Sequence, residues 1–311
     1  MEPKIGSVKH MKGVIMTKGI IYAAVLLCGL CLAGCAAKQP TVGDNTMNEE
    51  KTVTVKEIEG YELFWHDEFD GEKLDTKTWT VEAHKPGFVN HELQEYVISR
   101  DNIFLRDGNL VIKAIRTETE NGITKYTSGR MNTNYAMTFL YGKVVVRAKV
   151  PKGKGLWPAA WMMPASNAEY GQWPLGGEID IMEIVCHDTK TAYSTIHYGL
   201  PHSSQQGKLT IPEGEPDFSE AFHEFSVEWE PGEIRFYIDD THICTANEWY
   251  TKNYGQVPAQ FPAPFDKPFH IILNMAVGGD WPGSPDSATD FDNAEYLVDY
   301  VRVYQKKDVS K

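Results

Sequence analysis

The sequence predicts an all-β fold in which two antiparallel sheets pack as a sandwich or jelly roll. Short runs of β-branched and aromatic residues recur along residues 57–307, and turn residues separate them. No long apolar stripe with the 3.6-residue period of a helix lies between these runs. Strands at this density pack as two sheets around one core, whereas a helix bundle or a β-α-β array would need helical segments.

The first predicted strands come from alternation and from turn residues. Residues 109–114 follow a turn, residues 141–150 alternate apolar with basic side chains, and both segments are expected to be half exposed. Residues 223–229 alternate polar with apolar side chains, turn at Pro231-Gly232 and return as residues 234–238. This pattern is typical of a β-hairpin.

The last predicted strands differ in composition. Residues 268–277 are almost continuously apolar, which indicates a strand that is buried on both faces. Residues 296–304 form the final predicted strand. No internal repeat is evident, so residues 57–307 are predicted to form one large all-β domain.

Residues 1–35 read as an export signal and are set apart from the fold. Lys12 and Lys18 precede the apolar run 19–32, which has the length of a signal-peptide core and is short for a transmembrane helix. The run ends in Leu-Ala-Gly-Cys, which resembles the lipobox of bacterial lipoproteins, so Cys35 is the predicted lipid anchor. The alternative is an ordinary signal peptide that is cleaved at a small residue such as Ala37.

Residues 36–56 are polar and lack an apolar period, so they are predicted to form a flexible tether. A lipid anchor followed by a tether is typical of a protein of the bacterial cell envelope, at the outer membrane or the cell surface. Nothing in the sequence demands an oligomer, and a monomer is expected.

Cysteine content and charge narrow the function classes. Beyond the export signal only Cys186 and Cys244 remain, and buried free thiols are favoured over a single bridge. The formal net charge of −13 argues against nucleic acid as a partner, because an acidic surface repels a polyanion. A neutral polymer meets no such objection, and 8 Trp and 15 Tyr supply flat rings that suit sugars.

The segment around Glu178 is the most informative part of the sequence. Alternate residues of a strand share a face, so Glu178 and Asp180 point one way, while Glu183 is out of phase by one residue. A bulge near Ile181-Met182 would insert one extra residue and return Glu183 to the acidic face. Three carboxyl groups would then stand in a row.

Such a row of carboxyl groups is electrostatically unfavourable and is expected only where it serves a function. Like charges in close approach keep at least one proton bound at neutral pH. Glycosidic cleavage needs this condition, because one carboxylate attacks the anomeric carbon and a protonated acid supplies the leaving oxygen with its proton. Asp180, in the middle, is placed to tune its neighbours. A solvated polar face and a calcium site made of three acids are the alternatives, but a solvated face would carry mixed charges.

The segment Glu178-Ile-Asp-Ile-Met-Glu183 resembles the signature of glycoside hydrolase family 16, in the laminarinase-like form with one extra residue. Six other segments resemble the family in the same order along the chain. They are residues 65–71 (WHDEFDG), 90–94 (NHELQ), 126–130 (YTSGR), 155–163 (GLWPAAWMM), 273–279 (LNMAVGG) and 299–304 (DYVRVY). The resemblance covers the whole predicted domain.

The resemblance implies a β-jelly roll with a concave substrate cleft across one sheet. It also implies hydrolysis with retention through a covalent glycosyl-enzyme, and it requires no catalytic cofactor. Glu178 matches the nucleophile, Asp180 the assisting acid and Glu183 the general acid/base. The residues alone do not distinguish the nucleophile from the acid.

The resemblance further implies a set of sugar-binding residues. They are Trp173 as a stacking platform, Trp157 and Trp161 on one face of a single strand, Asn90 and Arg130 as hydrogen-bonding groups, and His197 beside the catalytic strand. Core packing is the alternative for each tryptophan and for the histidine, and a structural role is the alternative for the arginine.

A structural Ca²⁺ on the convex side is also implied. Asp299 matches the expected acid of the last strand, with Glu68 and the carbonyl of Gly108 as partners. Ordinary strand polarity is the alternative.

The predicted activity is endo-hydrolysis of β-1,3-glucan such as laminarin, with mixed-linkage 1,3-1,4-β-glucan as a further substrate. A dedicated mixed-linkage glucanase, a transglycosylase and a non-catalytic surface glycan-binding protein are the alternatives. Degenerate binders usually lose one acid, and all three are present here. Residues 84–90 and 167–172 depart from the family pattern, so the sequence does not determine which side groups of the substrate the cleft accepts.

Overall fold

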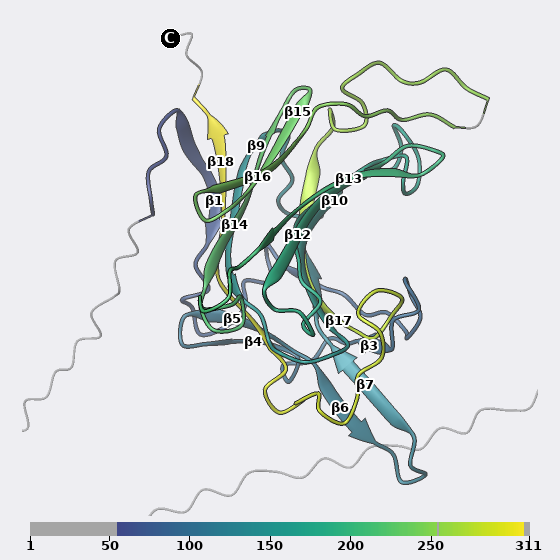
Figure 1. Cartoon of the computed structure of the whole chain (residues 1–311). Coiled ribbons are helices and arrows are strands. Elements are labelled where there is room, and N and C mark those ends of the chain that lie inside the picture. Colours follow the sequence, from purple (N-terminus) through teal and green to yellow (C-terminus); the bar gives the residue numbers. More distant parts are fainter. Residues whose placement is uncertain (1–54, 254, 308–311) are drawn as a thin grey trace, which may run out of the picture. The chain divides into compact units, whose positions relative to one another are not determined.

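The computed structural model describes residues 55–253 and 255–307, and in this part of the chain it contains strands and no helix (Figure 1). The strands are β1 (Tyr61–Asp67), β2 (Thr80–Val81), β3 (Gln94–Tyr96), β4 (Ile103–Arg106), β5 (Asn109–Lys113), β6 (Ile115–Glu118), β7 (Thr124–Ser128), β8 (Arg130–Asn132), β9 (Gly142–Lys149), β10 (Leu156–Pro164), β11 (Glu178–Glu183), β12 (Thr191–Tyr198), β13 (Ser203–Thr210), β14 (His223–Glu230), β15 (Glu233–Ile238), β16 (Thr241–Ala246), β17 (Phe269–Val277) and β18 (Glu295–Lys306). The all-β prediction is confirmed.

Two large sheets and one small sheet contain these strands. The eight-stranded sheet has the order β16-β15-β14-β9-β18-β5-β4, with β1 also paired to β18, and the seven-stranded sheet has the order β13-β12-β11-β10-β17-β8-β2. The pairs in both sheets are antiparallel, as the sequence predicts. The third sheet, β3-β7-β6, contains one parallel pair that the sequence does not predict. This pair needs a crossover, which β4 and β5 of the other sheet supply.

The facing sides of the two large sheets enclose one hydrophobic core. Trp229 of β14 is wholly buried there, and the rings of Phe139, Tyr141 and Phe269 pack edge-on against it at centroid distances of 6.2, 5.2 and 5.2 Å. Its Nε1 donates a hydrogen bond to the Phe265 carbonyl at 3.0 Å. This fully buried indole therefore keeps its one polar atom satisfied.

The strands predicted from alternation are present with small shifts at their ends, as β5, β9, the hairpin β14–β15, β17 and β18. All nine residues of β17 are buried, as its continuous apolar run predicts. The expectation that β5 and β9 are half exposed is only partly right. Val111 and Val145, which alternate with the core positions, are buried as well.

An N-terminal segment explains the burial of Val145. The outer-face cluster consists of Val145, Tyr300 and Tyr304, with Val55, Ile58 and Tyr61 packed against it. The Tyr304 hydroxyl also donates a hydrogen bond to the Lys56 carbonyl at 3.1 Å. Val55 and Lys56, which the sequence assigns to the tether, therefore belong to the folded domain.

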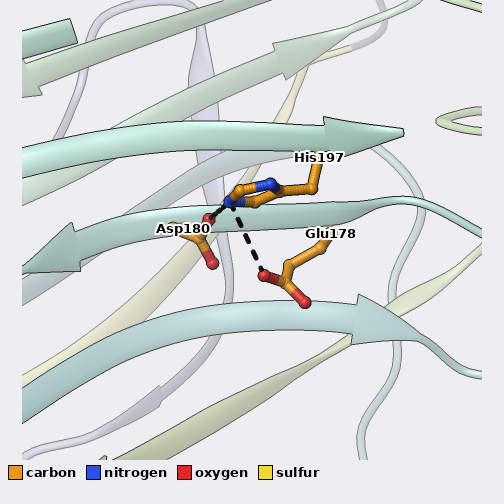
Figure 2. Close-up of side chains that lie close together, drawn as sticks. All are labelled: Glu178, Asp180 and His197. Atoms are coloured by element: carbon orange, nitrogen blue, oxygen red, sulfur yellow. Dashed lines mark ion pairs between the residues drawn. The ribbon is translucent and has the colours of Figure 1, made fainter. Parts of the chain in front are cut away.

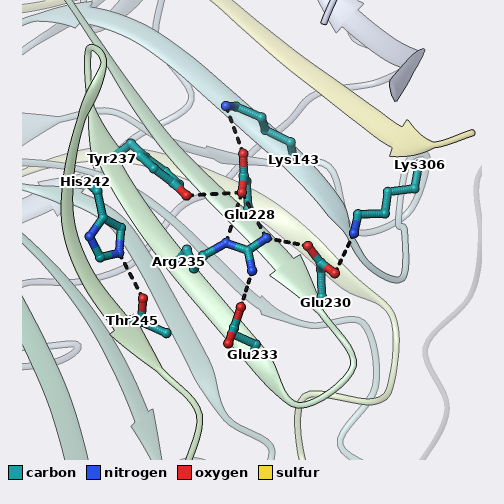
Figure 3. A network of polar contacts seen from close by, with 9 residues as sticks. All are labelled: Lys143, Glu228, Glu230, Glu233, Arg235, Tyr237, His242, Thr245 and Lys306. Carbon is teal, nitrogen blue, oxygen red and sulfur yellow. Dashed lines mark hydrogen bonds and ion pairs between the residues drawn. The ribbon is translucent and has the colours of Figure 1, made fainter. Parts of the chain in front are cut away.

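The outer face of the eight-stranded sheet also carries the charged network of Figure 3. Arg235 of β15 forms ion pairs with Glu228 and Glu230, among other carboxylates. Lys143 lies 3.2 Å from Glu228, and Lys306 lies 2.6 Å from Glu230. Opposite charges on neighbouring strands stabilise the pairing of those strands, so the acidic residues of this face are balanced locally.

Several predictions for the N-terminus concern residues outside the described part, among them the export signal and the lipid anchor at Cys35. In residues 55–253 and 255–307, no helix is long and apolar enough to cross a membrane. Cys186 and Cys244 are both free thiols, and Cys186 is buried as predicted, whereas Cys244 is only partly buried.

Gly142 of β9 lies against the backbone of β18, and adding a side-chain atom at this position tests how close the approach is. Its φ is 130°, and an added Cβ would lie 2.3 Å from the Tyr304 carbonyl oxygen. We expect Gly142→Ala to lower the free energy of unfolding, measured in urea, by about 2–4 kcal/mol. Gly122→Ala is the matched control, because its φ is also positive, at 71°, but nothing lies within 4 Å of the added Cβ. Equal losses in the two variants would contradict the steric explanation.

Candidate functional site

β11 carries its three acids on the side of the seven-stranded sheet that is turned away from the core, which we call the acid face. The register of β11 shifts between Asp180 and Glu183 against both β10 and β12. The extra residue lies at Ile181-Met182, and both of these side chains are fully buried. Ser194 Oγ donates a hydrogen bond to the Ile181 carbonyl at 2.8 Å, which satisfies the backbone at the bulge. The predicted bulge is confirmed.

One imidazole lies close to two of the acids, as Figure 2 shows. His197 of β12 lies opposite Glu178, and its Nε2 is 3.3 Å from Asp180 Oδ2 and 3.9 Å from Glu178 Oε1. Asp180 is only 3% exposed, and its Oδ2 has no hydrogen-bond partner among the described residues. A buried carboxyl oxygen without a donor favours the protonated state of the group.

Burial and mutual repulsion raise the pKa of all three acids. Burial, followed by the charge of Asp180, raises the pKa of Glu178 to about 8, and burial raises the pKa of Asp180 to about 8. Burial, followed by the charges of Asp180 and Glu178, raises the pKa of Glu183 well above its usual range. His197 and Arg130 are among the main groups that oppose the rise in the pKa of Glu178, whereas at Glu183 the main opposing charge is that of His197. Of the two glutamates, Glu178 therefore loses its proton at the lower pH, and Glu183 keeps its proton to a higher pH.

A tryptophan and two histidines stand beside the acids. Trp173 is 49% exposed, and its ring packs against His202 with centroids 4.9 Å apart. His202 in turn stacks on His197 at 5.1 Å, with His197 Nδ1 and His202 Nε2 2.9 Å apart. The predicted platform Trp173 thus packs against the histidines beside the acids and keeps about half of its surface open to a ligand.

Trp161 and Arg130 lie on the other side of the catalytic strand. Trp161 of β10 lies opposite Asp180, and the Arg130 guanidinium lies 4.8 Å from the centre of its ring. Trp161 Nε1 donates a hydrogen bond to Asn274 Oδ1 at 2.7 Å, and Arg130 Nε donates one to Glu82 Oε2 at 2.9 Å. Both predicted residues are therefore on the acid face, and partners hold both in place.

Trp157 lies on the same face of β10 as Trp161, as predicted. It packs edge-on against Trp281 at 5.3 Å, and Trp281 packs edge-on against Tyr193 at 5.1 Å. Tyr193 lies opposite Glu183 in the ladder of β11 and β12. Three aromatic rings therefore form a wall at the Glu183 end of the acid row.

Asn90 lies in the loop that leads to β3 and has a positive φ of 50°. Its Nδ2 donates a hydrogen bond to Glu92 Oε1 at 3.3 Å, and Glu92 Oε2 accepts further bonds from Gln94 at 2.7 Å and Tyr96 at 3.4 Å. Asn274 Nδ2 donates to the Tyr96 hydroxyl oxygen at 3.0 Å. A buried network thus connects Asn90 to Asn274, the partner of Trp161 on the acid face.

The sequence pattern does not single out six residues that the structure brings to this region. They are Glu82, Glu92, Tyr193, His202, Asn274 and Trp281. Glu92 and Asn274 lie inside segments that resemble the family, so motif context was a usable signal for them. Glu82 and His202 lie outside such segments, and only tertiary contacts reveal them.

The predicted calcium ligands do not fit a cation site in the arrangement described. Arg302 donates hydrogen bonds at 2.9 and 2.8 Å to the two oxygens of Glu68, and Arg147 forms an ion pair with Asp299. Gly108 lies in the turn between β4 and β5. Each carboxylate is therefore neutralised by an arginine, and a calcium ion would have to displace that arginine.

Glu178, Asp180 and His197 offer ligand atoms within 4.8 Å of one another, and they are the one such group in residues 55–253 and 255–307. Two carboxylates with an imidazole suit zinc better than calcium. With Glu183 beside them, the same residues provide a carboxyl group that loses its proton more readily next to one that keeps it, and aromatic rings lie on both sides. That combination is suited to acid–base and nucleophilic attack on a sugar acetal.

Comparison with known proteins agrees with this chemistry. The sequence pattern of Glycosyl hydrolases family 16 matches residues 90–302. The chain is 37% identical over 289 residues to Glucan endo-1,3-beta-glucosidase A1 of Niallia circulans. The aligned region covers 87% of this chain but only 42% of that protein. It is also 38% identical over 254 residues to the Beta-glucanase of Rhodothermus marinus, and that alignment covers 79% of this chain and 85% of that protein.

The fold is also similar to solved structures. The laminarinase catalytic domain of Thermotoga maritima MSB8 superposes with a TM-score of 0.70 at 40% sequence identity. That match covers 80% of this chain and 100% of the solved domain.

The raised pKa of Glu178 predicts a pH-dependent change in stability. The pKa is about 8 in the folded protein against an ordinary value of 4.5, so between these values the unfolded chain loses its proton first and unfolding is favoured. We expect Glu178→Gln to raise the free energy of unfolding at pH 8 by on the order of 2 kcal/mol, and to have no such effect at pH 4. Urea unfolding at the two pH values measures this. Glu72→Gln, at an exposed glutamate, is the control, and a gain that is equal at both pH values would refute the prediction.

Proposed function

Because this chain belongs to glycosyl hydrolases family 16, we propose that it is an endo-acting β-glucanase that hydrolyses β-1,3-glucosidic bonds, with mixed-linkage 1,3-1,4-β-glucan as a further substrate. The observation that carries this proposal is the row of Glu178, Asp180 and Glu183, which the bulge turns to one face between Trp161 and Trp173. The acids supply the chemistry, and the rings supply flat apolar surface for the C–H faces of glucose.

In the first step, Glu183 donates its proton to the glycosidic oxygen while the Glu178 carboxylate attacks the anomeric carbon. The bond to the leaving oxygen breaks, and an ester between the sugar and Glu178 forms. Burial and two neighbouring acids raise the pKa of Glu183, which suits it to hold this proton. His197 and Arg130 favour the negative charge that Glu178 needs for attack.

In the second step, Glu183 is ionised and accepts a proton from water. The oxygen of that water attacks the same carbon and releases Glu178 as a carboxylate, so the two displacements together retain the configuration. Asp180 interacts electrostatically with both glutamates and raises the pKa of each, while the negative charge passes from Glu178 to Glu183 in the first step and back in the second.

The charge distribution favours a neutral glucan over a sulfated polymer. The chain carries a net charge of −13, and Arg130 is already paired with Glu82. A dedicated mixed-linkage glucanase is the nearest alternative, because it would use the same acids. A non-catalytic glycan-binding protein is disfavoured, since binding alone gives no reason to bury three carboxyl groups beside one another.

Glu178→Ala tests the proposed activity. We expect the wild type to release reducing sugar from laminarin and from barley mixed-linkage glucan, and the variant to lose about 10³-fold or more of both rates, because it lacks the nucleophile. Glu72→Ala, which removes an exposed glutamate, should keep the wild-type rates. Activity on barley glucan alone would assign a mixed-linkage glucanase, and an inactive wild type would refute the proposal.

We also propose that the protein is exported and held at the cell envelope by a lipid on Cys35. The support is the apolar run 19–32, which ends in Leu-Ala-Gly-Cys. We expect Cys35→Ser to abolish incorporation of labelled palmitate and to release the full-length chain from the membrane fraction of cells. Cys28→Ser, within the apolar run, is the matched control and should keep both properties. Palmitate incorporation into the Cys35→Ser protein would contradict the proposal.

A further inference from the structure

The loop between β2 and β3 departs from the family pattern, and its residues His84 and Phe88 have no place in the mechanism above. The His84 and Phe88 rings stack with centroids 3.8 Å apart and an interplanar angle of 14°. Phe88 is nevertheless 50% exposed. The imidazole therefore covers part of the phenyl ring, and the other half of the side chain is open to solvent.

A continuous series of contacts joins this stack to the catalytic strand. Glu82 Oε2 accepts a hydrogen bond from Arg130 at 2.9 Å and lies 2.6 Å from His84 Nε2. Arg130 lies over the ring of Trp161, which is opposite Asp180. The series runs across β10, β17 and β8, in the order in which those strands follow β11 in the sheet. Neighbouring strands are about 4.8 Å apart, so β8 lies roughly 14 Å from β11, and the stack lies beyond β8.

The loop holds the stack in a defined position. The backbone of His84 exchanges two hydrogen bonds with Tyr96, at 3.0 and 2.9 Å, and Gly87 N donates to the Glu92 carbonyl at 2.7 Å. Glu82 is in turn bonded by Asn132 Nδ2 at 2.6 Å. A ring that is held in place before binding loses little conformational entropy when a ligand arrives, so its contacts contribute to affinity more fully.

We propose that His84 and Phe88 form a distal sugar-binding platform, which packs against a glucosyl unit of the same polysaccharide several units away from the cleaved bond. The open half of Phe88 offers the apolar surface that the C–H face of a pyranose ring requires. The platform rests on the proposed glucanase function, and it makes the enzyme prefer β-1,3-glucan chains long enough to reach from β11 past β8. Short oligosaccharides do not reach it.

Kinetics with β-1,3-glucan oligosaccharides of increasing length test this platform. In Phe88→Ala we expect KM for long oligosaccharides to rise about 3- to 10-fold with kcat unchanged, and both constants for the shortest cleaved oligosaccharide to stay at wild-type values. Phe88→Tyr keeps the ring and should restore KM. Phe64→Ala is the matched control, because Phe64 is 47% exposed and lies on β1 of the other large sheet.

The outcomes separate the platform from the glucanase function. A wild type that cleaves the oligosaccharides, with Phe88→Ala equal to Phe64→Ala on the long ones, overturns the platform and leaves the function intact. An equal rise in KM for short and long oligosaccharides also overturns it, because the effect would then not be distal. If the wild type cleaves no β-glucan, the function fails, and retardation of wild type and Phe88→Ala in laminarin-containing gels decides whether Phe88 binds the polymer.

Discussion

The burial of Asp180 between Glu178 and Glu183 is the constraint on which the rest of this site depends. A carboxyl group that is 3% exposed and has like groups on both sides cannot ionise together with them at neutral pH. The protons must therefore be divided unequally among the three. His197 and Arg130 oppose the rise in the pKa of Glu178, so Glu178 is the first of the two glutamates to lose its proton, and two like charges keep the proton on Glu183. A nucleophile and an acid thus arise from two side chains of the same type.

The scaffold tolerates this arrangement because it holds β11 within the sheet on both sides. β10 and β12 pair with β11, and the bulge places Ile181 and Met182 in the core although it turns Glu183 outward. The opposite side of the sandwich is built differently. There, ion pairs such as those around Arg235 neutralise acidic side chains, so the pKa values of Glu228 and Glu230 lie below their usual range. Glutamates are therefore ion-paired on one face of the protein, whereas on the other face they are buried with raised pKa values.

Much of the fold follows from the sequence, and the exceptions have physical causes. Alternation and turn residues predict β9, β17 and the hairpin of β14 and β15, because side-chain period and turn chemistry are local properties. Burial of Val145 is not predicted, since the cover comes from Val55 and Ile58, far away along the chain. The parallel pair of β3 and β7 is missed for the same reason. The calcium ligands follow from family resemblance, which carries no information on the arginines that face Glu68 and Asp299.

By itself, the sequence determined the class of the fold, the row of three acids and the bulge that aligns them, because strand period makes the phase of Glu178, Asp180 and Glu183 readable from spacing alone. Tertiary structure alone decided which of the two glutamates loses its proton more readily and what surrounds the acids. Those properties depend on burial and on charges contributed by His197 and Arg130 from other strands. Electrostatic interactions act through space, and the distances that set them exist only once the sheet has formed.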